Sequence, residues 1–131
     1  MYKDPDDCIP SKPVAVLQIH GTQDEQVHVD GGTLGDNPPK AYPSALESLD
    51  DWAGYDGCTG ELVLTPETLD LDRTLQGANG PNETSVSGFE GCPAGISLEL
   101  WSIDGADHSP DWTDGFGGLV IDYLLDHEKP A

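Results

Sequence analysis

The stretch Val14-Ala15-Val16-Leu17-Gln18-Ile19, which ends at His20-Gly21-Thr22, carries the strongest fold signal of the sequence. Almost every position in it is apolar, a pattern typical of a strand in a parallel sheet whose two faces are covered. A second strand is predicted over residues 96–103, where apolar and polar side chains alternate. We therefore predict an α/β fold with a short parallel core sheet and flanking helices.

Two helices are predicted to flank this sheet. Ser44 followed by Glu47 is a capping-box pattern, and apolar residues then recur at helical spacing. Gly54 or Gly57 is expected to end this first helix. The second helix is predicted from about Asp114 to Leu125, where an apolar stripe again has helical spacing.

The remaining segments are less regular. Residues 61–90 predict a small β excursion of short strands, interrupted by Pro66 and by a turn rich in glycine and asparagine. These strands are expected at residues 61–64, 68–72 and 84–89. The stretch 23–40 is rich in glycine and proline and is predicted to be a loop. The length of 131 residues allows one domain, residues 1–131.

The chain is strongly acidic, since 25 Asp and Glu residues face 5 Lys and Arg, for a net charge of −20. Such a surface repels phosphate, so we predict neither a nucleic-acid partner nor binding to an anionic membrane. No apolar run approaches the roughly 20 residues of a membrane span, and the first residues lack a signal-peptide pattern. Salt screens the self-repulsion, so a halophilic source is one interpretation, and an acidic protein without that adaptation is the other.

The three cysteines are Cys8, Cys58 and Cys92, and the simplest interpretation of an odd count is one pair and one orphan. Cys58 and Cys92 lie in expected loops at the two ends of the β excursion, where a disulfide would hold that segment together. Such a bond favours a secreted or periplasmic location, whereas three free thiols in a reducing cytosol are the alternative. The sequence has no CxxC motif, so we predict no cysteine zinc site.

The candidate chemistry lies in the two loops that follow the predicted parallel strands. His20 and Asp24 follow the first strand, and Asp107 and His108 follow the second. Because α/β proteins place their sites at the carboxyl ends of parallel strands, Asp24 and His108 can form an orienting carboxylate and a general base. The alternative roles are ordinary: Asp24 as a turn residue that bonds its own backbone, and His108 as a solvated side chain.

Several segments, in their order along the chain, resemble the polyhydroxybutyrate depolymerase and feruloyl esterase family of the α/β-hydrolase superfamily. They are residues 14–24 with Gly31-Gly32, the helix ending at Trp52-Ala53, the turn Gly57-Cys58-Thr59-Gly60, residues 98–109 and the closing helix. This resemblance implies that Asp24 is the triad acid and His108 the triad base of a serine carboxylic-ester hydrolase that uses no metal or other cofactor.

The chain departs from the family in one respect that decides its expected activity. The family places its nucleophile in a Gly-x-Ser-x-Gly elbow upstream of the acid loop, and no such motif occurs here. We therefore expect the C-terminal portion of an α/β-hydrolase fold, with the nucleophile-bearing half absent and Cys8 orphaned from a partner in that half. The free edge of the strand at 14–19 is then expected to pair with a second copy, giving a homodimer, or to be covered by the N-terminus.

Further side chains are expected around the cleft or elsewhere. His20 is expected to close the strand end and line the cleft, and His28 to flank it. Trp112 is expected to form a wall for an acyl or aromatic group, and Trp101 to pack in the core. Acidic residues 104–114 raise calcium as a minor alternative, although their spacing is not that of an EF-hand and we predict no metal site. Asp70 and Asp72 are expected to be solvated.

The sequence is compatible with three functions. The first is the acid-and-base half of an esterase, inactive alone, acting on small, feruloyl, acetyl or polymeric esters when completed. The second is a binding or self-associating module without catalysis, and the third is an enzyme that uses Asp24 and His108 with water or an unusual nucleophile.

Overall fold

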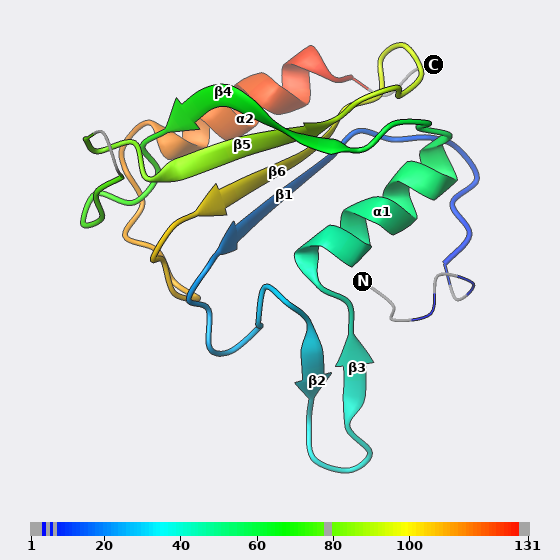
Figure 1. The fold of residues 1–131 in the computed structure, drawn as a ribbon, viewed down its shortest axis with the longest axis horizontal. Helices are drawn as coiled ribbons and strands as arrows, with labels where there is room; N and C mark the ends of the chain where they lie inside the picture. Colours follow the sequence, from blue (N-terminus) through cyan, green and yellow to red (C-terminus); the bar gives the residue numbers. More distant parts are fainter. Residues whose placement is uncertain (1–3, 5, 7, 78–79, 129–131) are drawn as a thin grey trace.

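The computed structural model describes residues 4, 6, 8–77 and 80–128, and its centre is a four-stranded mixed sheet with the order β1-β6-β5-β4 (Figure 1). The predicted parallel pair is present: β1 (Val16–Gly21) runs parallel to β6 (Leu98–Ile103), in a register that aligns Gly21 with Ile103. The carboxyl ends of β1 and β6 therefore lie side by side, and the loops that follow them leave the sheet at the same end.

The β excursion extends this sheet by two antiparallel strands. β5 (Thr84–Phe89) pairs with β6, and β4 (Leu62–Leu69) pairs with β5. The prediction of two short strands separated at Pro66 was wrong, because β4 continues through it with a register shift between Leu64 and Thr68. An edge strand tolerates proline, since the missing N–H faces away from its neighbour.

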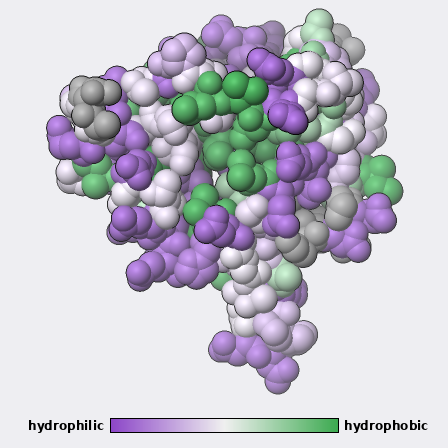
Figure 2. All heavy atoms as spheres, in the orientation of Figure 1, coloured by the Kyte–Doolittle hydropathy of each residue, from purple (hydrophilic) through white to green (hydrophobic). Residues whose placement is uncertain are grey.

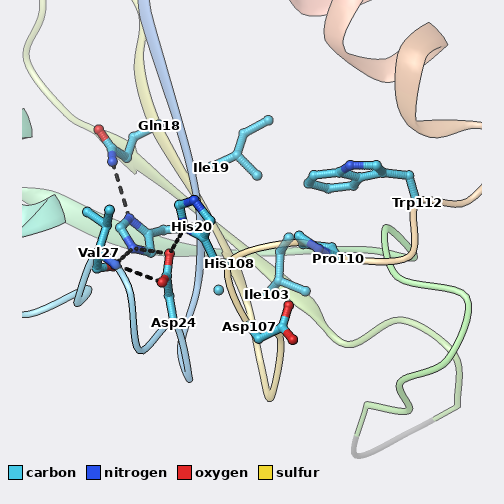
Figure 3. Close-up of a pocket in the computed structure, with 11 residues that line it drawn as sticks. Gln18, Ile19, His20, Asp24, Val27, Ile103, Asp107, His108, Pro110 and Trp112 are labelled. Atoms are coloured by element: carbon cyan, nitrogen blue, oxygen red, sulfur yellow. Dashed lines mark hydrogen bonds and ion pairs between the residues drawn. The ribbon is translucent and has the colours of Figure 1, made fainter.

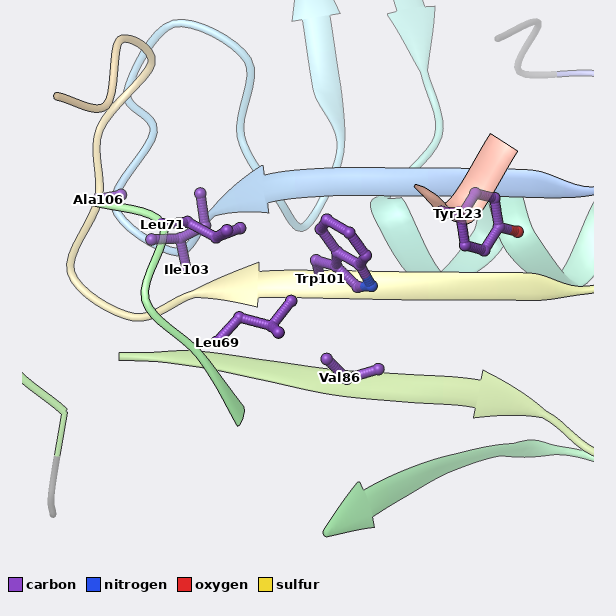
Figure 4. Close-up of a cluster of buried hydrophobic side chains, with 7 residues drawn as sticks. All are labelled: Leu69, Leu71, Val86, Trp101, Ile103, Ala106 and Tyr123. Atoms are coloured by element: carbon purple, nitrogen blue, oxygen red, sulfur yellow. The ribbon is translucent and has the colours of Figure 1, made fainter. Parts of the chain in front are cut away.

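The helices cover opposite faces of the sheet. α1 (Ala45–Asp56) packs Leu49 against Leu98 and Leu100, with the predicted capping box of Ser44 and Glu47 at its start. It ends at Gly57, whose φ of 75° is the left-handed conformation that glycine favours. α2 (Phe116–Asp126) covers the other face, where its residues pack on the core cluster drawn in Figure 4. That cluster contains Trp101, so its expected core role is confirmed.

α1 does not cover the whole of its face. It contacts β1 and β6, and the core on this side contains only Leu62 and Phe89 from the outer strands. Figure 2 shows a hydrophobic area over the strands of the sheet, surrounded by hydrophilic side chains, and Leu64 of β4 is 67% exposed. Within the described residues, neither helix is long and apolar enough to cross a membrane.

Two expectations for the N-terminal part of the chain need correction. The stretch 23–40 is not only a loop, because β2 (Gly32–Leu34) and β3 (Lys40–Tyr42) form an antiparallel hairpin that projects from the body in Figure 1. In addition, β1 is only half-buried from Val16 to His20, because it lies at the edge of the sheet and, among the described strands, pairs with β6 alone.

The predicted disulfide is confirmed, since Cys58 and Cys92 are bonded across a sequence separation of 34 residues. The bond joins the end of α1 to the turn between β5 and β6, at the opposite end of β6 from the loop that holds His108. Cys8 is a free thiol in this chain.

Candidate active site

Asp24 is held in the loop after β1, which we call the acid loop, by the backbone of the same loop. Its Oδ1 accepts hydrogen bonds from the N–H groups of Gln26 and Val27, both at 2.8 Å. The expected turn role is therefore present. It leaves the second oxygen, Oδ2, to face the loop between β6 and α2 that carries His108, which we call the base loop. Asp24 is buried, with 8% of its surface exposed.

The structure brings Asp24 and His108 together across 84 positions of sequence. Nδ1 of His108 lies 2.9 Å from Oδ2 of Asp24. Because an ionised carboxylate only accepts hydrogen bonds, Nδ1 carries the proton and Nε2 of the neutral ring carries the lone pair. The His108 side chain is 43% exposed, and no described residue forms a hydrogen bond with its Nε2.

The electrostatics of Asp24 favour the carboxylate form. Burial opposes ionisation, but hydrogen bonds from the Val27 N–H, the His108 ring and the Gln26 N–H outweigh it and lower the pKa of Asp24 to about 2. At neutral pH the carboxylate is therefore a fixed negative charge behind the imidazole, which is the arrangement that orients a catalytic base.

A second imidazole lies close to the same carboxylate. Nε2 of His20 is 2.7 Å from the carbonyl oxygen of Val27 and 3.5 Å from Oδ2 of Asp24. Its Nδ1 lies 3.5 Å from the amide nitrogen of Gln18. His20 was expected to line the cleft, and its contacts with Val27 and Asp24 were not anticipated.

A pocket of about 300 Å³ opens beside this group and reaches Trp112 (Figure 3). Its lining combines the polar residues Gln18, His20, Asp24, Asp107 and His108 with the apolar Ile19, Val27, Ile103, Pro110 and Trp112, and with Gly21. The structure thus places His20 and Trp112 at one pocket. His28 does not line it: its side chain is exposed, and its backbone N–H donates to the hydroxyl of Tyr42.

Trp112 is positioned by ring contact with α2 and by hydrogen bonds between its neighbours and the β excursion. Its ring stacks on Phe116 at 3.9 Å with an interplanar angle of 15°. The backbone of the same loop is fixed by Asp72, whose Oδ2 accepts from the N–H of Asp111 at 3.0 Å, and by the N–H of Thr113, which donates to Leu71. The base loop is therefore anchored to a segment far from it in sequence.

The expectation that Asp72 is solvated was wrong. Asp72 is 4% exposed, and its Oδ1 accepts from both the N–H and the hydroxyl of Thr74. Burial opposes ionisation, and these bonds together with the Asp111 N–H overcome it, so the pKa of Asp72 is lowered. No local pattern marks this role, because Asp111 is 39 residues away.

The acidic residues of the base loop bind either Arg73 or a nearby backbone N–H group. Arg73 pairs with Asp111 at 3.2 Å and with Asp114 at 3.4 Å, and Asp107 accepts from the N–H of Ser109. Asp114 lies before α2 rather than in it, since Gly115 is the N-cap. Among the described residues, no group of three or more His, Cys, Asp or Glu side chains is placed to hold a metal ion.

The chain is similar to a known esterase. It is 28% identical over 125 residues to a protein named feruloyl esterase B, from Piromyces equi. The aligned region covers 94% of this chain and 20% of that protein, so the chain spans about a fifth of the length of this relative. No family model matches the chain, and no solved structure matches it significantly. The similarity is weak, and it indicates an esterase relationship rather than one particular family.

Proposed function

We propose that this chain carries the acid and the base of a serine carboxylic-ester hydrolase, with the nucleophilic serine on a segment outside this sequence. The observation that carries the proposal is the 2.9 Å contact between Asp24 and Nδ1 of His108, which leaves Nε2 turned away from the acid. The similarity to a feruloyl esterase supports an ester as the substrate. The disulfide is compatible with an extracellular or periplasmic location.

The protonation states of Asp24 and His108 determine the steps of the proposed reaction. Nε2 of His108 takes the proton of the serine hydroxyl as the serine oxygen attacks the ester carbonyl carbon, and then passes that proton to the leaving alkoxide. A water molecule attacks the acyl-serine by the same steps in reverse and releases the acid. Asp24 stays ionised throughout, because its pKa of about 2 lies far below neutral pH. Its negative charge stabilises the transient imidazolium.

The test of the base is hydrolysis of p-nitrophenyl acetate by the purified chain. The lone pair of Nε2 can attack this activated ester directly or through water, so we expect His108→Ala to lose most of the histidine-dependent rate. His127→Ala is the matched control, because His127 follows α2, hydrogen-bonds the carbonyl of Tyr123 and does not line the pocket of Asp24 and His108. Equal rates for the wild-type chain and His108→Ala would overturn the proposal.

The position of the serine is tested separately with a fluorophosphonate, which forms a covalent bond to an activated serine oxygen and releases fluoride. We expect the mass of the chain to stay unchanged. A serine labelled in the wild-type chain but not in His108→Ala would place the nucleophile within this sequence and contradict that part of the proposal.

A second candidate function is a self-associating module, and the observation that favours it is the outer edge of β1, which pairs with no strand among the described residues. A strand edge offers a row of backbone donors and acceptors to another chain. The charge of −20 opposes contact between copies, so we expect association to strengthen with salt. Sedimentation at low and high salt measures this, and a monomer under both conditions would exclude the module.

A further inference from the structure

His20 is placed to act on Asp24 rather than on a substrate. It is the last residue but one of β1, and its side chain is 11% exposed, against 43% for His108. Figure 3 shows both imidazoles beside the carboxylate, with Trp112 at the other end of the pocket. The His20 ring therefore presents much less surface to the pocket than the His108 ring does.

The surroundings of His20 settle which nitrogen carries its proton. Nε2 faces two acceptors, the carbonyl oxygen of Val27 at 2.7 Å and the carboxylate of Asp24 at 3.5 Å. A lone pair on Nε2 would point at both and be repelled, so Nε2 is the donor. Nδ1 then accepts from the side-chain amide of Gln18 at 3.5 Å.

These bonds form a continuous connection from β1 to the base. Gln18 orients the His20 ring, His20 holds the carbonyl of Val27, and the N–H of Val27 holds Oδ1 of Asp24. The remaining oxygen, Oδ2, then meets His108. Gln23, Glu25 and Gln26 around this turn are exposed. The less exposed His20 therefore connects the turn to the sheet through its bond with the Val27 carbonyl.

We propose that His20 is a positioning residue that holds the turn of Asp24 so that its Oδ2 stays in contact with Nδ1 of His108. The inference rests on the proposed function for its catalytic meaning, whereas the geometry that it predicts is measurable without any substrate. His20 acts through Asp24 and touches no reacting atom.

The test is NMR of the imidazole protons in His20→Leu and His20→Gln. The leucine variant has no donor for Val27, so we expect the His108 Nδ1 proton to exchange with water roughly fivefold faster, the effect of losing about one hydrogen bond. Glutamine keeps an N–H group that can reach the Val27 carbonyl, so we expect His20→Gln to restore the slow exchange. His28→Leu, which changes an exposed imidazole on the same segment, should leave the signal as in the wild-type chain.

The outcomes separate positioning from general stability. The indole signal of Trp101 reports the intact core in each variant, and where His20→Leu does not fold, His20→Asn replaces it, since its amide is too short to reach Val27. An unchanged His108 proton in a folded leucine or asparagine variant would overturn the inference. If the proton depends on His20 while p-nitrophenyl acetate hydrolysis does not depend on His108, the positioning role stands and the proposed function fails.

Discussion

Gly21 and Ala106 are in direct contact between the acid and base loops. A Cβ atom on Gly21 would lie 2.4 Å from the carbonyl oxygen of Ala106, a distance that no side chain tolerates. The same carbonyl accepts from the N–H of Gln23 at 2.9 Å, and the Thr22 hydroxyl accepts from the N–H of Gly105. The approach of Asp24 to His108 therefore depends on a glycine at the end of β1.

Gly21→Ala is expected to push the two loops apart. The added methyl group meets backbone atoms that cannot move independently, so we expect a loss of about 1–3 kcal/mol in the free energy of unfolding. The His108 Nδ1 proton should exchange faster as well. Urea denaturation measures the first effect and NMR the second.

Gly54→Ala is the matched control for that substitution. Gly54 lies on the exposed side of α1, and a Cβ there has no neighbour within 4 Å. Alanine is the better helix former, so this variant should gain up to about 1 kcal/mol. If Gly21→Ala were as stable as Gly54→Ala, the contact between the loops would not be tight.

The lowered pKa of Asp24 predicts a pH dependence of stability. Its value of about 2 in the folded chain lies below the ordinary 3.8, so the ionised form stabilises the fold above about pH 4. That contribution, about 2 kcal/mol, is lost as the pH falls from about 4 to about 2. Denaturation of wild type and Asp24→Asn across this range measures it, and the two curves should converge at the acid end.

Asp36→Asn is the control for general charge. Asp36 is exposed at the tip of the β2–β3 hairpin, and the substitution removes one negative charge, as Asp24→Asn does. Its difference from wild type should stay small over the whole pH range. Equal behaviour of the two variants would show that Asp24 is not specifically stabilised.

Asp72→Ala is expected to release the base loop from the β excursion. The N–H groups of Asp111 and Thr74 would lose their charged acceptor, and because both residues are exposed, water can replace part of these bonds, so we expect a total loss of about 1–3 kcal/mol in the free energy of unfolding. We also expect Trp112 to become more accessible, measured by fluorescence quenching. The expectation fails if quenching and stability match those of Asp36→Ala.

Removal of the disulfide is expected to destabilise the chain without disturbing the pair. Loop-closure entropy for the 34-residue separation gives about 3–4 kcal/mol for Cys58→Ser with Cys92→Ser. Because the bond lies at the far end of β6, the His108 proton should be retained at a temperature where the variant is folded. Cys8→Ser serves as the control, and a loss of the His108 signal in the folded double variant would contradict this separation.

The elements that were predictable have local causes. The first helix was found because Ser44 and Glu47 form its cap and Gly57 ends it, all within one stretch of sequence. The parallel pair was found because its strands have apolar patterns. The meeting of Asp24 and His108 was then accessible, since both follow strands that end at the same edge.

The elements that were missed depend on distant or weak signals. The β2–β3 hairpin has three-residue strands with mostly exposed side chains, so no apolar alternation marks it. The burial of Asp72 depends on Asp111, and the bond of His20 to Val27 depends on how the turn after β1 closes. Neither contact leaves a pattern in sequence.

The place of β1 at the edge of the sheet links assembly to chemistry. The strand that carries His20 and leads to Asp24 has one side paired with β6 and, among the described strands, the other side unpaired. Any strand that docks on this free side restricts the segment from which the acid is suspended. By linkage, if docking raises the affinity of the Asp24–His108 site for a ligand by some factor, that ligand raises the affinity of docking by the same factor. Association through β1 and proton transfer by His108 would then depend on each other.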